Sequence, residues 1–407
     1  MQQQGKSSAV WVLALAVFAV GTGEFVLAGL IPEFADEFAV SIGEAGQIVT
    51  VFAVTCAIAG PLATAATARW PRRRVLLAAG ALYIVGSVVT AVNPGFEVVL
   101  LGQFAAAFGA GVLVPNAVVS AARLVSAERR GRAIATVVSG FTIAVAVGAP
   151  AGTVVGAELG WRVTLWIAAG VAAIGLIGIA ALVPPLPAEV VPGGERRGFL
   201  GSLADMGGPL ARPRVIALLA TTLVAFTAVY IPYTYVSVIF EPATGGDGVL
   251  LSLVMLVFGV AGLGGNLLGG RLIDRYGGAI VVMVALAVLA ASLAAMVIAR
   301  DDLVWSIVVS AVYGASAFAI TAPQQHRVLG ADPSHAAVLI SLNQSVLYLA
   351  IAASGVVGAM GIDVIGASNT LWLAVAISLG AMVTSFAAGG RQSSLRREPS
   401  PLGSEPR

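Results

Sequence analysis

The stretch ARWPRRRVLLAAGALYIVGSVVTAVNP, residues 68–94, places four arginines directly before an uncharged, largely apolar run over 75–92. A helix needs roughly 20 such residues to cross a bilayer, because unpaired backbone amides cannot be left in lipid. Similar runs follow one another along the 407 residues, of which 58% are hydrophobic and 10% charged, whereas a soluble domain carries about 25% charged residues. The pattern predicts an all-α integral membrane protein.

The apolar runs and the basic residues between them predict the topology. All of the 22 basic side chains except Arg162 and Arg300 fall on one side of the predicted membrane. By the positive-inside rule both termini are expected in the cytoplasm, in a multi-pass protein of the bacterial inner membrane. The net charge of +2 indicates no nucleic-acid partner. Helices are predicted at 9–31, 45–67, 75–92, 98–122, 133–157, 163–184, 215–240, 248–272, 279–299, 303–328, 335–361 and 369–390.

The twelve helices fall into two halves. Residues 1–184 and 215–390 are predicted to form two six-helix bundles, joined by a proline-containing cytoplasmic linker over 185–214 and followed by a disordered cytoplasmic tail over 391–407. A shift of 206 residues aligns the halves, because it places Arg69 on Arg275 and the start of the first span on the start of the seventh. Parallel repeats of this kind build many secondary transporters.

Three stretches resemble the major facilitator superfamily, and within it the twelve-span drug:proton antiporter group. They are FAVGTGEFVLAGLIPEFADEFAVSIGEAG (18–46), GFTIAVAVGAPAGTVVGAELGWR (140–162) and GRLIDRYG (270–277). The first is similar to bacterial sugar and nucleoside efflux and chloramphenicol-resistance permeases. Two positions depart from the family pattern: Ala68 stands where a loop acid is usual, and Gln103 stands where an arginine is thought to assist proton movement. These departures leave proton coupling open.

Glu24 is the candidate proton-coupling residue. It is the one carboxylate placed deep inside a predicted span. A charge at that depth costs several kcal/mol in lipid, so the carboxyl should face a cavity, find a partner or stay protonated. A group of this kind can take a proton from one side and release it to the other, or exchange it for substrate. The alternative is a permanently neutral glutamate hydrogen-bonded to a neighbour.

Polar and aromatic residues on other spans are candidates to line a substrate cavity with Glu24. The shift of 206 places Tyr230 opposite Glu24, and Tyr233 follows one turn later. Tyrosines offer apolar faces with hydroxyl groups, which suits an amphipathic ligand, although they are also common membrane-interface anchors. Asn116 and Asn343 are placed to line a pore, although each alone is more typical of a hydrogen bond between helices.

Two further groups are candidates for conformational roles. The resemblance implies that span five, with Gly148, Pro150 and Gly152, seals the central path against leak as in exporters; plain tight packing is the alternative. In the second group, Arg271, Asp274 and Arg275 are expected on the cytoplasmic loop after span eight. An acid between two arginines there would form a bistable ion-pair latch, or would simply hold a turn.

The leading hypothesis is a secondary transporter that exports a small organic molecule, such as a phenicol-like antibiotic, by proton antiport. The alternative is a facilitator or symporter for a sugar, nucleoside or similar nutrient. An enzyme is not expected, because the sequence has no H-E-x-x-H zinc motif, no G-x-S-x-G elbow and no P-loop. No cofactor or metal is expected. The partners are the small-molecule substrate, protons and the lipid bilayer, and a monomer is the family's usual state.

Overall fold

The computed structural model describes residues 2–67, 70–92, 95–126, 129–186 and 208–395. Throughout these ranges the regular structure is helical and contains no strand. Eleven of the helices are long and apolar enough to cross a membrane. The last of these, Val338–Ala388, is 51 residues long and reverses direction at Gly366, whose φ of 81° lies in the left-handed region. The predicted all-α membrane fold is therefore confirmed, and the two predicted final spans are the two limbs of one folded helix.

Within the described residues, the first half of the chain contributes nine helical segments. The predicted boundaries agree with them to within a few residues, except that α1 begins seven residues before the predicted start at residue 9, a short helix, α2, follows the first span, and span five contains a π-helical turn. The segments are α1 (Gln2–Gly29), α2 (Ile31–Phe38), α3 (Ile42–Ala66), α4 (Arg72–Val92), α5 (Phe96–Leu124), α6 (Arg130–Ile143), the π turn η2 (Ala144–Gly148), α7 (Ala149–Leu159) and α8 (Trp161–Leu182).

The second half begins at Pro213, a residue type suited to the first turn of a helix. Its segments are α10 (Pro213–Thr234), α11 (Val236–Ile239), α12 (Glu241–Thr244), α13 (Gly248–Tyr276), α14 (Gly278–Ala299), α15 (Leu303–Ala319), α16 (Thr321–Ala331), the 3₁₀ turn η3 (Pro333–His335) and α17 (Ala336–Leu395).

The predicted end of span seven is wrong. Span seven does not continue to 240, because Tyr235 leaves the helical conformation (φ −108°, ψ 32°) and separates α10 from α11. The predicted tail begins at 391, whereas α17 is helical to Leu395; the disorder expected of the tail stays a prediction. Residues 396–407 and most of the predicted linker, 187–207, lie outside the described residues.

Short polar signals set several of the helix ends. Asp247 accepts hydrogen bonds from the amides of Val249 and Leu250 at 2.7 and 3.1 Å, which caps α13. Asp302 accepts from the amide of Trp305 at 3.0 Å and caps α15. Such caps satisfy amides that have no partner inside the helix.

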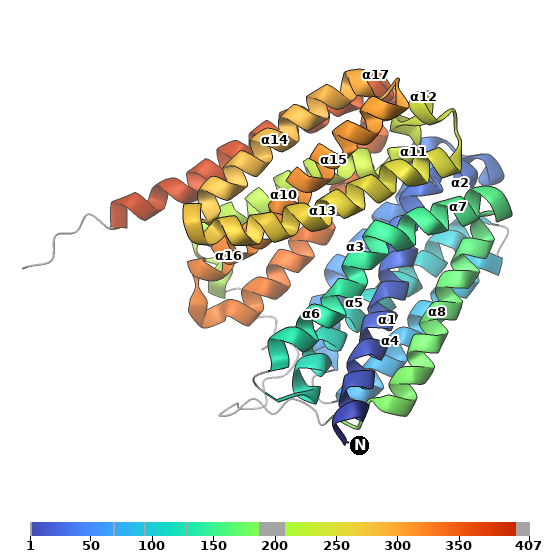
Figure 1. Cartoon of the computed structure of the whole chain (residues 1–407), viewed down its shortest axis with the longest axis vertical. Helices are drawn as coiled ribbons and strands as arrows, with labels where there is room; N and C mark the ends of the chain where they lie inside the picture. Colours follow the sequence, from blue (N-terminus) through green and yellow to red (C-terminus); the bar gives the residue numbers. More distant parts are fainter. Residues whose placement is uncertain (1, 68–69, 93–94, 127–128, 187–207, 396–407) are drawn as a thin grey trace, which may run out of the picture.

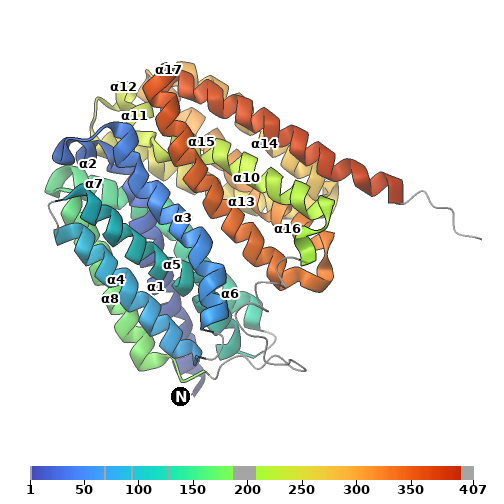
Figure 2. The same cartoon turned by 180° about the vertical axis from the view of Figure 1, so that it is seen from behind.

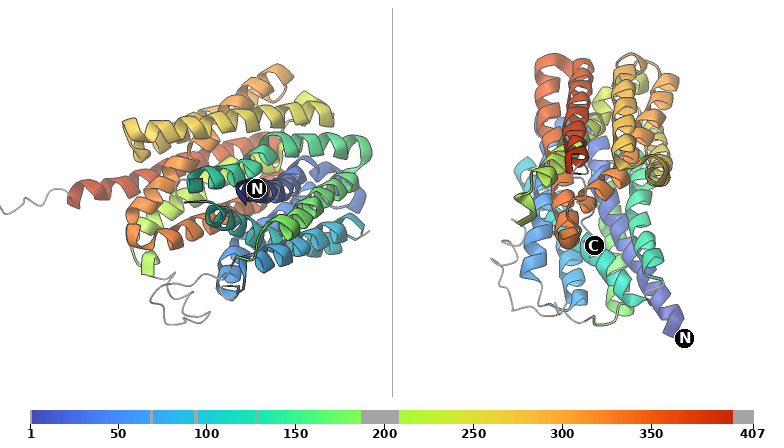
Figure 3. Two further views of the ribbon diagram at one scale, coloured as in Figure 1. Left: turned by 60° about the horizontal axis from the view of Figure 1, so that its bottom comes forward. Right: turned by 90° about the vertical axis from the view of Figure 1, so that its left-hand side faces the viewer.

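The helices form two groups that diverge toward one end of the molecule (Figures 1 and 2). We call this end, where α1, α6 and α10 begin, the N-terminal end; the distal end holds α2, α11 and α12. The two views in Figure 3 show the same division, with the blue and green helices apart from the yellow and red ones. Contacts between the groups join α1, α2, α3, η2 and α7 to α10, α11, α13 and α17.

The contacts between the groups gather toward the distal end. A Cβ atom added at Gly43 of α3 would lie 3.2 Å from the Cβ of Ala359 in α17. Thr153 of α7 lies 3.5 Å from the sulfur of Met255 in α13. Tyr235, which is fully buried, packs against α3 and donates a hydrogen bond to the carbonyl of Gly355 at 2.6 Å. The distal end is therefore closed by direct helix packing.

Candidate functional site

Glu24 lies near the distal third of α1, where the two groups of helices meet. Its side chain is 8% exposed. The neighbouring residue Phe25 packs edge-on against Tyr233 of the second group, with ring centroids 5.8 Å apart, and the carbonyl of Ala28 accepts a hydrogen bond from Ser237 at 3.3 Å. This segment of α1 is therefore inside the contact between the two groups, which explains the burial of the carboxyl group.

A tyrosine from the opposite group contacts the Glu24 carboxyl. The hydroxyl of Tyr348, in the first limb of α17, donates a hydrogen bond to Oε2 of Glu24 at 3.4 Å. Tyr348 is itself 7% exposed. We did not identify this residue from the sequence. The only available signal was a tyrosine far from either end of span eleven, where an interface anchor is not expected.

Tyr230, which the repeat places opposite Glu24, and Tyr233 lie close to the Glu24 carboxyl. Both are buried, and their rings meet edge-on at 6.1 Å. The Glu24 carboxyl interacts electrostatically with both phenols. Tyr233 continues the contact to Phe258 of α13 at 5.1 Å. The carboxyl is therefore bordered by aromatic rings that carry hydroxyl groups, most of them from the second half of the chain.

Asn116 and Asn343 are not brought to this site. Asn116 of α5 donates to the carbonyl of Val112 at 2.8 Å and accepts from Arg72 of α4 at 3.0 Å. Asn343 of α17 accepts a hydrogen bond from Thr222 of α10 at 2.9 Å. Both side chains join helices inside their own group. A hydrogen bond between helices was the alternative given for each asparagine.

Thr222 belongs to a longer polar chain in the second group. Gln324 of α16 donates to the hydroxyl of Thr222 at 3.2 Å. Arg327 donates to Gln324 at 3.2 Å and to the hydroxyl of Ser385 at 2.7 Å. This chain of hydrogen bonds joins α10, α16 and both limbs of α17, so it fixes their relative positions near the N-terminal end.

Span five packs its glycines against α1. Cβ atoms added at Gly148 and Gly152 would clash with Thr22 and Val26 respectively, and the latter approach is 2.7 Å. The four-residue spacing matches on both helices, so one face of each lies in close contact. Pro150 has no amide hydrogen and cannot bond the carbonyl four residues back. The π turn Ala144–Gly148 ends just before Ala149, the residue that precedes Pro150. The amide of Ala149 donates a hydrogen bond to the carbonyl of Ala144.

The same π turn faces the second group of helices. A Cβ atom added at Gly259 of α13 would lie 2.5 Å from the Cα of Ala146. The glycine-rich segment thus separates α1 from α13 by little more than its own backbone. The predicted role of Gly148, Pro150 and Gly152 in sealing the central path stays a prediction, and the structure supplies the tight packing that such a seal needs.

Comparisons with known proteins agree with one family. The profile of the Major Facilitator Superfamily matches residues 13–355. The chain belongs to the major facilitator superfamily. The superfamily consists of transporters, so the chain is a transporter and not an enzyme.

Three relatives from this superfamily illustrate the likeness. The transporter YbcL of Bacillus subtilis is 29% identical over 93% of this chain and 94% of its own length. The inner membrane transport protein YdhP of Escherichia coli is 30% identical over 78% of this chain and 79% of its own. The chloramphenicol resistance protein of Streptomyces lividans is 30% identical over 65% of this chain and 67% of its own.

Solved structures of the superfamily share the fold. The peptide transporter POT in complex with sulfate has a TM-score of 0.73 and 14% identity, over 98% of this chain and 99% of that one. The xylose transporter XylE of Escherichia coli, in a partially occluded inward open conformation, has a TM-score of 0.71 and 17% identity over the same shares of both chains.

The residues of the superfamily's loop motif lie elsewhere than expected. Arg271, Asp274 and Arg275 are in the last two turns of α13 and not on a loop, because the helix continues to Tyr276 and ends at Gly277, which has a φ of 78°. All three charged side chains are exposed. Within the described parts of the chain none of them forms an ion pair, and Arg275 lies over the ring of Tyr276 at 5.2 Å. The latch stays a prediction.

The two departures from the superfamily's motifs have different outcomes. Gln103 is buried at 3% exposure and donates to the hydroxyl of Thr90 at 3.3 Å, which joins α5 to α4. This hydrogen bond lies inside the first group of helices. Ala68 lies outside the described residues.

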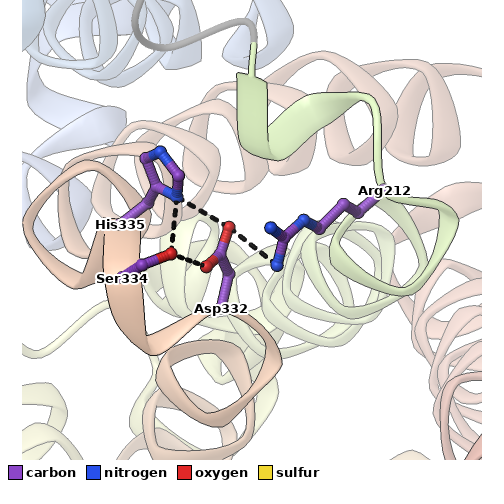
Figure 4. Close-up of polar contacts among 4 residues, drawn as sticks. All are labelled: Arg212, Asp332, Ser334 and His335. Carbon is purple, nitrogen blue, oxygen red and sulfur yellow. Dashed lines mark hydrogen bonds and ion pairs between the residues drawn. The ribbon is translucent and has the colours of Figure 1, made fainter.

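A separate ionic cluster lies where the linker enters α10. Arg212 forms an ion pair with Asp332, with 2.9 Å between Nη1 and Oδ2. Asp332 also accepts a hydrogen bond from Ser334 at 2.5 Å and contacts Nδ1 of His335 at 2.8 Å (Figure 4). The bond from Ser334 and the nearby His335 and Arg212 hold the pKa of Asp332 below its usual value. The cluster ties the beginning of α10 to the turn between α16 and α17.

The arrangement around Glu24 can hold and release a proton. A carboxyl beside a phenol can donate or accept a hydrogen bond, according to its own protonation state. The described residues contain no group of three or more His, Cys, Asp or Glu side chains that could hold a metal ion. The chemistry of the site therefore consists of one titratable carboxyl, several phenols and aromatic surface.

Proposed function

We propose that this chain is a secondary transporter that exports a small amphipathic organic molecule in exchange for protons, with Glu24 as the coupling acid. The single observation that supports this most is the hydrogen bond from Tyr348 to Glu24 at 3.4 Å, which joins the two bundles at the carboxyl. A change in protonation or in ligand contact at Glu24 would alter this link directly. The site is formed within one chain, so the proposal includes a working monomer.

The arginines support the orientation. In the structure Arg72, Arg123, Arg212 and Arg275 lie at the ends of helices on the N-terminal side. By the positive-inside rule, that side is the cytoplasm. Because the two bundles meet at the distal end and diverge at the N-terminal end (Figure 1), the structure would then correspond to a state open to the cytoplasm. Rocking of the bundles about the site would give alternating access.

The proton gradient can drive such an export. Each proton returning down about 100 mV releases roughly 2.3 kcal/mol, and about 1.4 kcal/mol corresponds to a tenfold concentration ratio. A one-for-one exchange would hold a neutral substrate at a ratio near fiftyfold by the same arithmetic. In this cycle a protonated Glu24 gives up its proton toward the cytoplasm when substrate enters, and it takes up a proton from outside when substrate leaves.

The rings around Glu24 support the substrate class. Tyr230, Tyr233 and Phe25 offer flat apolar surface next to one acid. Such surroundings suit an aromatic molecule with polar groups, and a chloramphenicol resistance protein is among the relatives. A phenicol-like compound is therefore our first candidate.

Transport into inverted membrane vesicles tests the proposal. Energised vesicles containing the wild-type chain should accumulate a phenicol above equilibrium, and Glu24→Gln should abolish accumulation. The matched control is Glu97→Gln, which changes an exposed glutamate at the start of α5. Equilibration without accumulation in the wild type would indicate a facilitator. Undiminished accumulation in Glu24→Gln would remove Glu24 as the coupling acid.

A further inference from the structure

The outer surface of the second bundle carries an apolar groove between α13, α14 and α15. Its volume is about 410 Å³, within the roughly 300–1,000 Å³ typical of ligand sites. Its walls are exposed aliphatic side chains, with Leu268 and Leu272 on α13 and Ile280 and Val284 on α14. Ala315 of α15 also lines the groove. Because the walls are exposed, the groove opens to the surroundings of the protein, which for a membrane-spanning segment is lipid.

The groove has the length of one membrane leaflet. On α13 it extends from Gly265 to Tyr276, the last residue of the helix. At 1.5 Å per residue this is about 16 Å, close to half of the roughly 30 Å hydrocarbon core. The groove therefore begins at the membrane surface on the N-terminal side and ends near the middle of the bilayer. An extended acyl chain of a phospholipid occupies the same depth.

The surface end of the groove carries positive charge. Tyr276 lines the groove, and the guanidinium of Arg275 lies over its ring at 5.2 Å. Leu268, Leu272 and Tyr276 share one face of α13 through their four-residue spacing, whereas Asp274 is displaced to the other side of the helix. The cation next to the groove is therefore not neutralised by the neighbouring acid.

The first turn of α14 adds to the positive potential at the same end. Its amide end begins at Gly278, two residues after Tyr276, and the amide end of a helix attracts anions. Arg327 packs against Gly278, but its guanidinium is bonded to Gln324 and Ser385. Arg275 is thus the side chain positioned to meet an anionic group at the surface.

We propose that this groove binds one anionic phospholipid of the leaflet on the N-terminal side. An acyl chain would lie along Leu268, Leu272 and Val284, and the head-group phosphate would contact Arg275, with the amide end of α14 beside it. The site is separate from Glu24 and does not depend on the direction or coupling of transport. A phospholipid matches both features, because it has a phosphate for Arg275 and an acyl chain for the apolar groove. A soluble anion lacks the chain, and an apolar helix lacks the phosphate.

Native mass spectrometry of the purified chain tests the proposal, with 1-palmitoyl-2-oleoyl phosphatidylglycerol compared with the matching phosphatidylcholine. We expect one retained phosphatidylglycerol at low lipid concentration. Arg275→Gln should weaken this binding about tenfold, as expected for loss of a charge-assisted hydrogen bond, and should bring it to the level of phosphatidylcholine. Arg123→Gln, an exposed arginine in the last turn of α5, is the matched control and should bind as the wild type does.

A second variant tests the groove itself. Ala315→Leu places extra side-chain volume in the groove and should weaken retention of both lipids, whereas Arg275→Gln should weaken the anionic lipid more, because the choline ammonium of phosphatidylcholine already offsets its phosphate. The proposal is overturned if both lipids bind the wild type equally, or if Arg275→Gln behaves like Arg123→Gln. It is also overturned if Ala315→Leu, shown to be folded by its unchanged circular dichroism, retains phosphatidylglycerol as the wild type does, because the lipid would then sit elsewhere.

Discussion

Tyr348 of α17 donates a hydrogen bond to the carboxyl of Glu24 in α1, with 3.4 Å between the phenol oxygen and Oε2. The two residues are 324 positions apart in the chain and belong to different bundles. The bond therefore reports directly on the distance between the bundles at the depth of the candidate coupling acid. A transporter that rocks about this region must stretch, break or exchange it during each cycle.

Removing the phenol hydroxyl should weaken coupling without abolishing it. In Tyr348→Phe the Glu24 carboxyl loses one partner, worth about 0.5–1.5 kcal/mol for a neutral hydrogen bond, so we expect a loss of up to about tenfold in the accumulation ratio. Proton-driven uptake into inverted vesicles measures this. Tyr83→Phe is the comparison, because the buried Tyr83 also interacts electrostatically with Glu24 but donates its hydrogen bond to Ala19 within the first bundle. Equal losses in both variants would argue against a special role for Tyr348.

A disulfide across the closed distal end should arrest transport. A Cβ atom at Gly43 would lie 3.2 Å from that of Ala359, near the roughly 3.5–4.5 Å of a disulfide. The double variant Gly43→Cys and Ala359→Cys should cross-link under mild oxidation and lose transport, which a reductant should restore. Each single variant is the control. The native Cys56 is 3% exposed and should not interfere. Full transport in a fully cross-linked protein would show that this end need not open.

Packing of span five against α1 should tolerate no added methyl group. In Gly152→Ala the new carbon would approach Val26 to 2.7 Å, and overpacking of this kind costs about 1–3 kcal/mol. We expect a lower midpoint of thermal unfolding in detergent. Gly170→Ala is the control, because nothing lies within 4 Å of the added carbon and alanine is the better helix former by about 0.8–1 kcal/mol. A Gly152→Ala protein as stable as Gly170→Ala would contradict the packing described.

The Asp332 cluster should make stability depend on acid pH. The pKa of Asp332 is lower in the folded protein than in the unfolded chain, so its contribution is complete above the unfolded-state value of about 3.9 and is lost as pH falls through the folded pKa. Thermal unfolding of the wild type and of Asp332→Asn should therefore differ at pH 6 and converge below about pH 4. Asp301→Asn, at an exposed acid, is the control. A constant difference down to pH 3 would contradict this linkage.

Some features were predictable because they depend on local composition alone. A run of apolar residues must form a helix in lipid, so the spans and the arginines at their ends follow from the residues themselves. Glu24 was identifiable for the same reason, since a lone carboxyl in a span is costly wherever its helix packs. The repeat placed Tyr230 near it. We did not predict that α13 continues through Arg271 and Arg275, because basic residues are equally typical of a helix end and of a loop.

The membrane class, the positions of the spans and the candidate acid follow from the sequence alone, because burial of apolar helices and exclusion of charge from lipid act on each segment separately. Which side chains meet depends on the tertiary structure. In the folded protein Tyr348 is hydrogen-bonded to Glu24, Asn116 to Arg72 and Asn343 to Thr222. Arg275 lies beside an apolar groove. These pairings join residues far apart in the chain, so they depend on how whole helices pack together, and no local pattern contains that information.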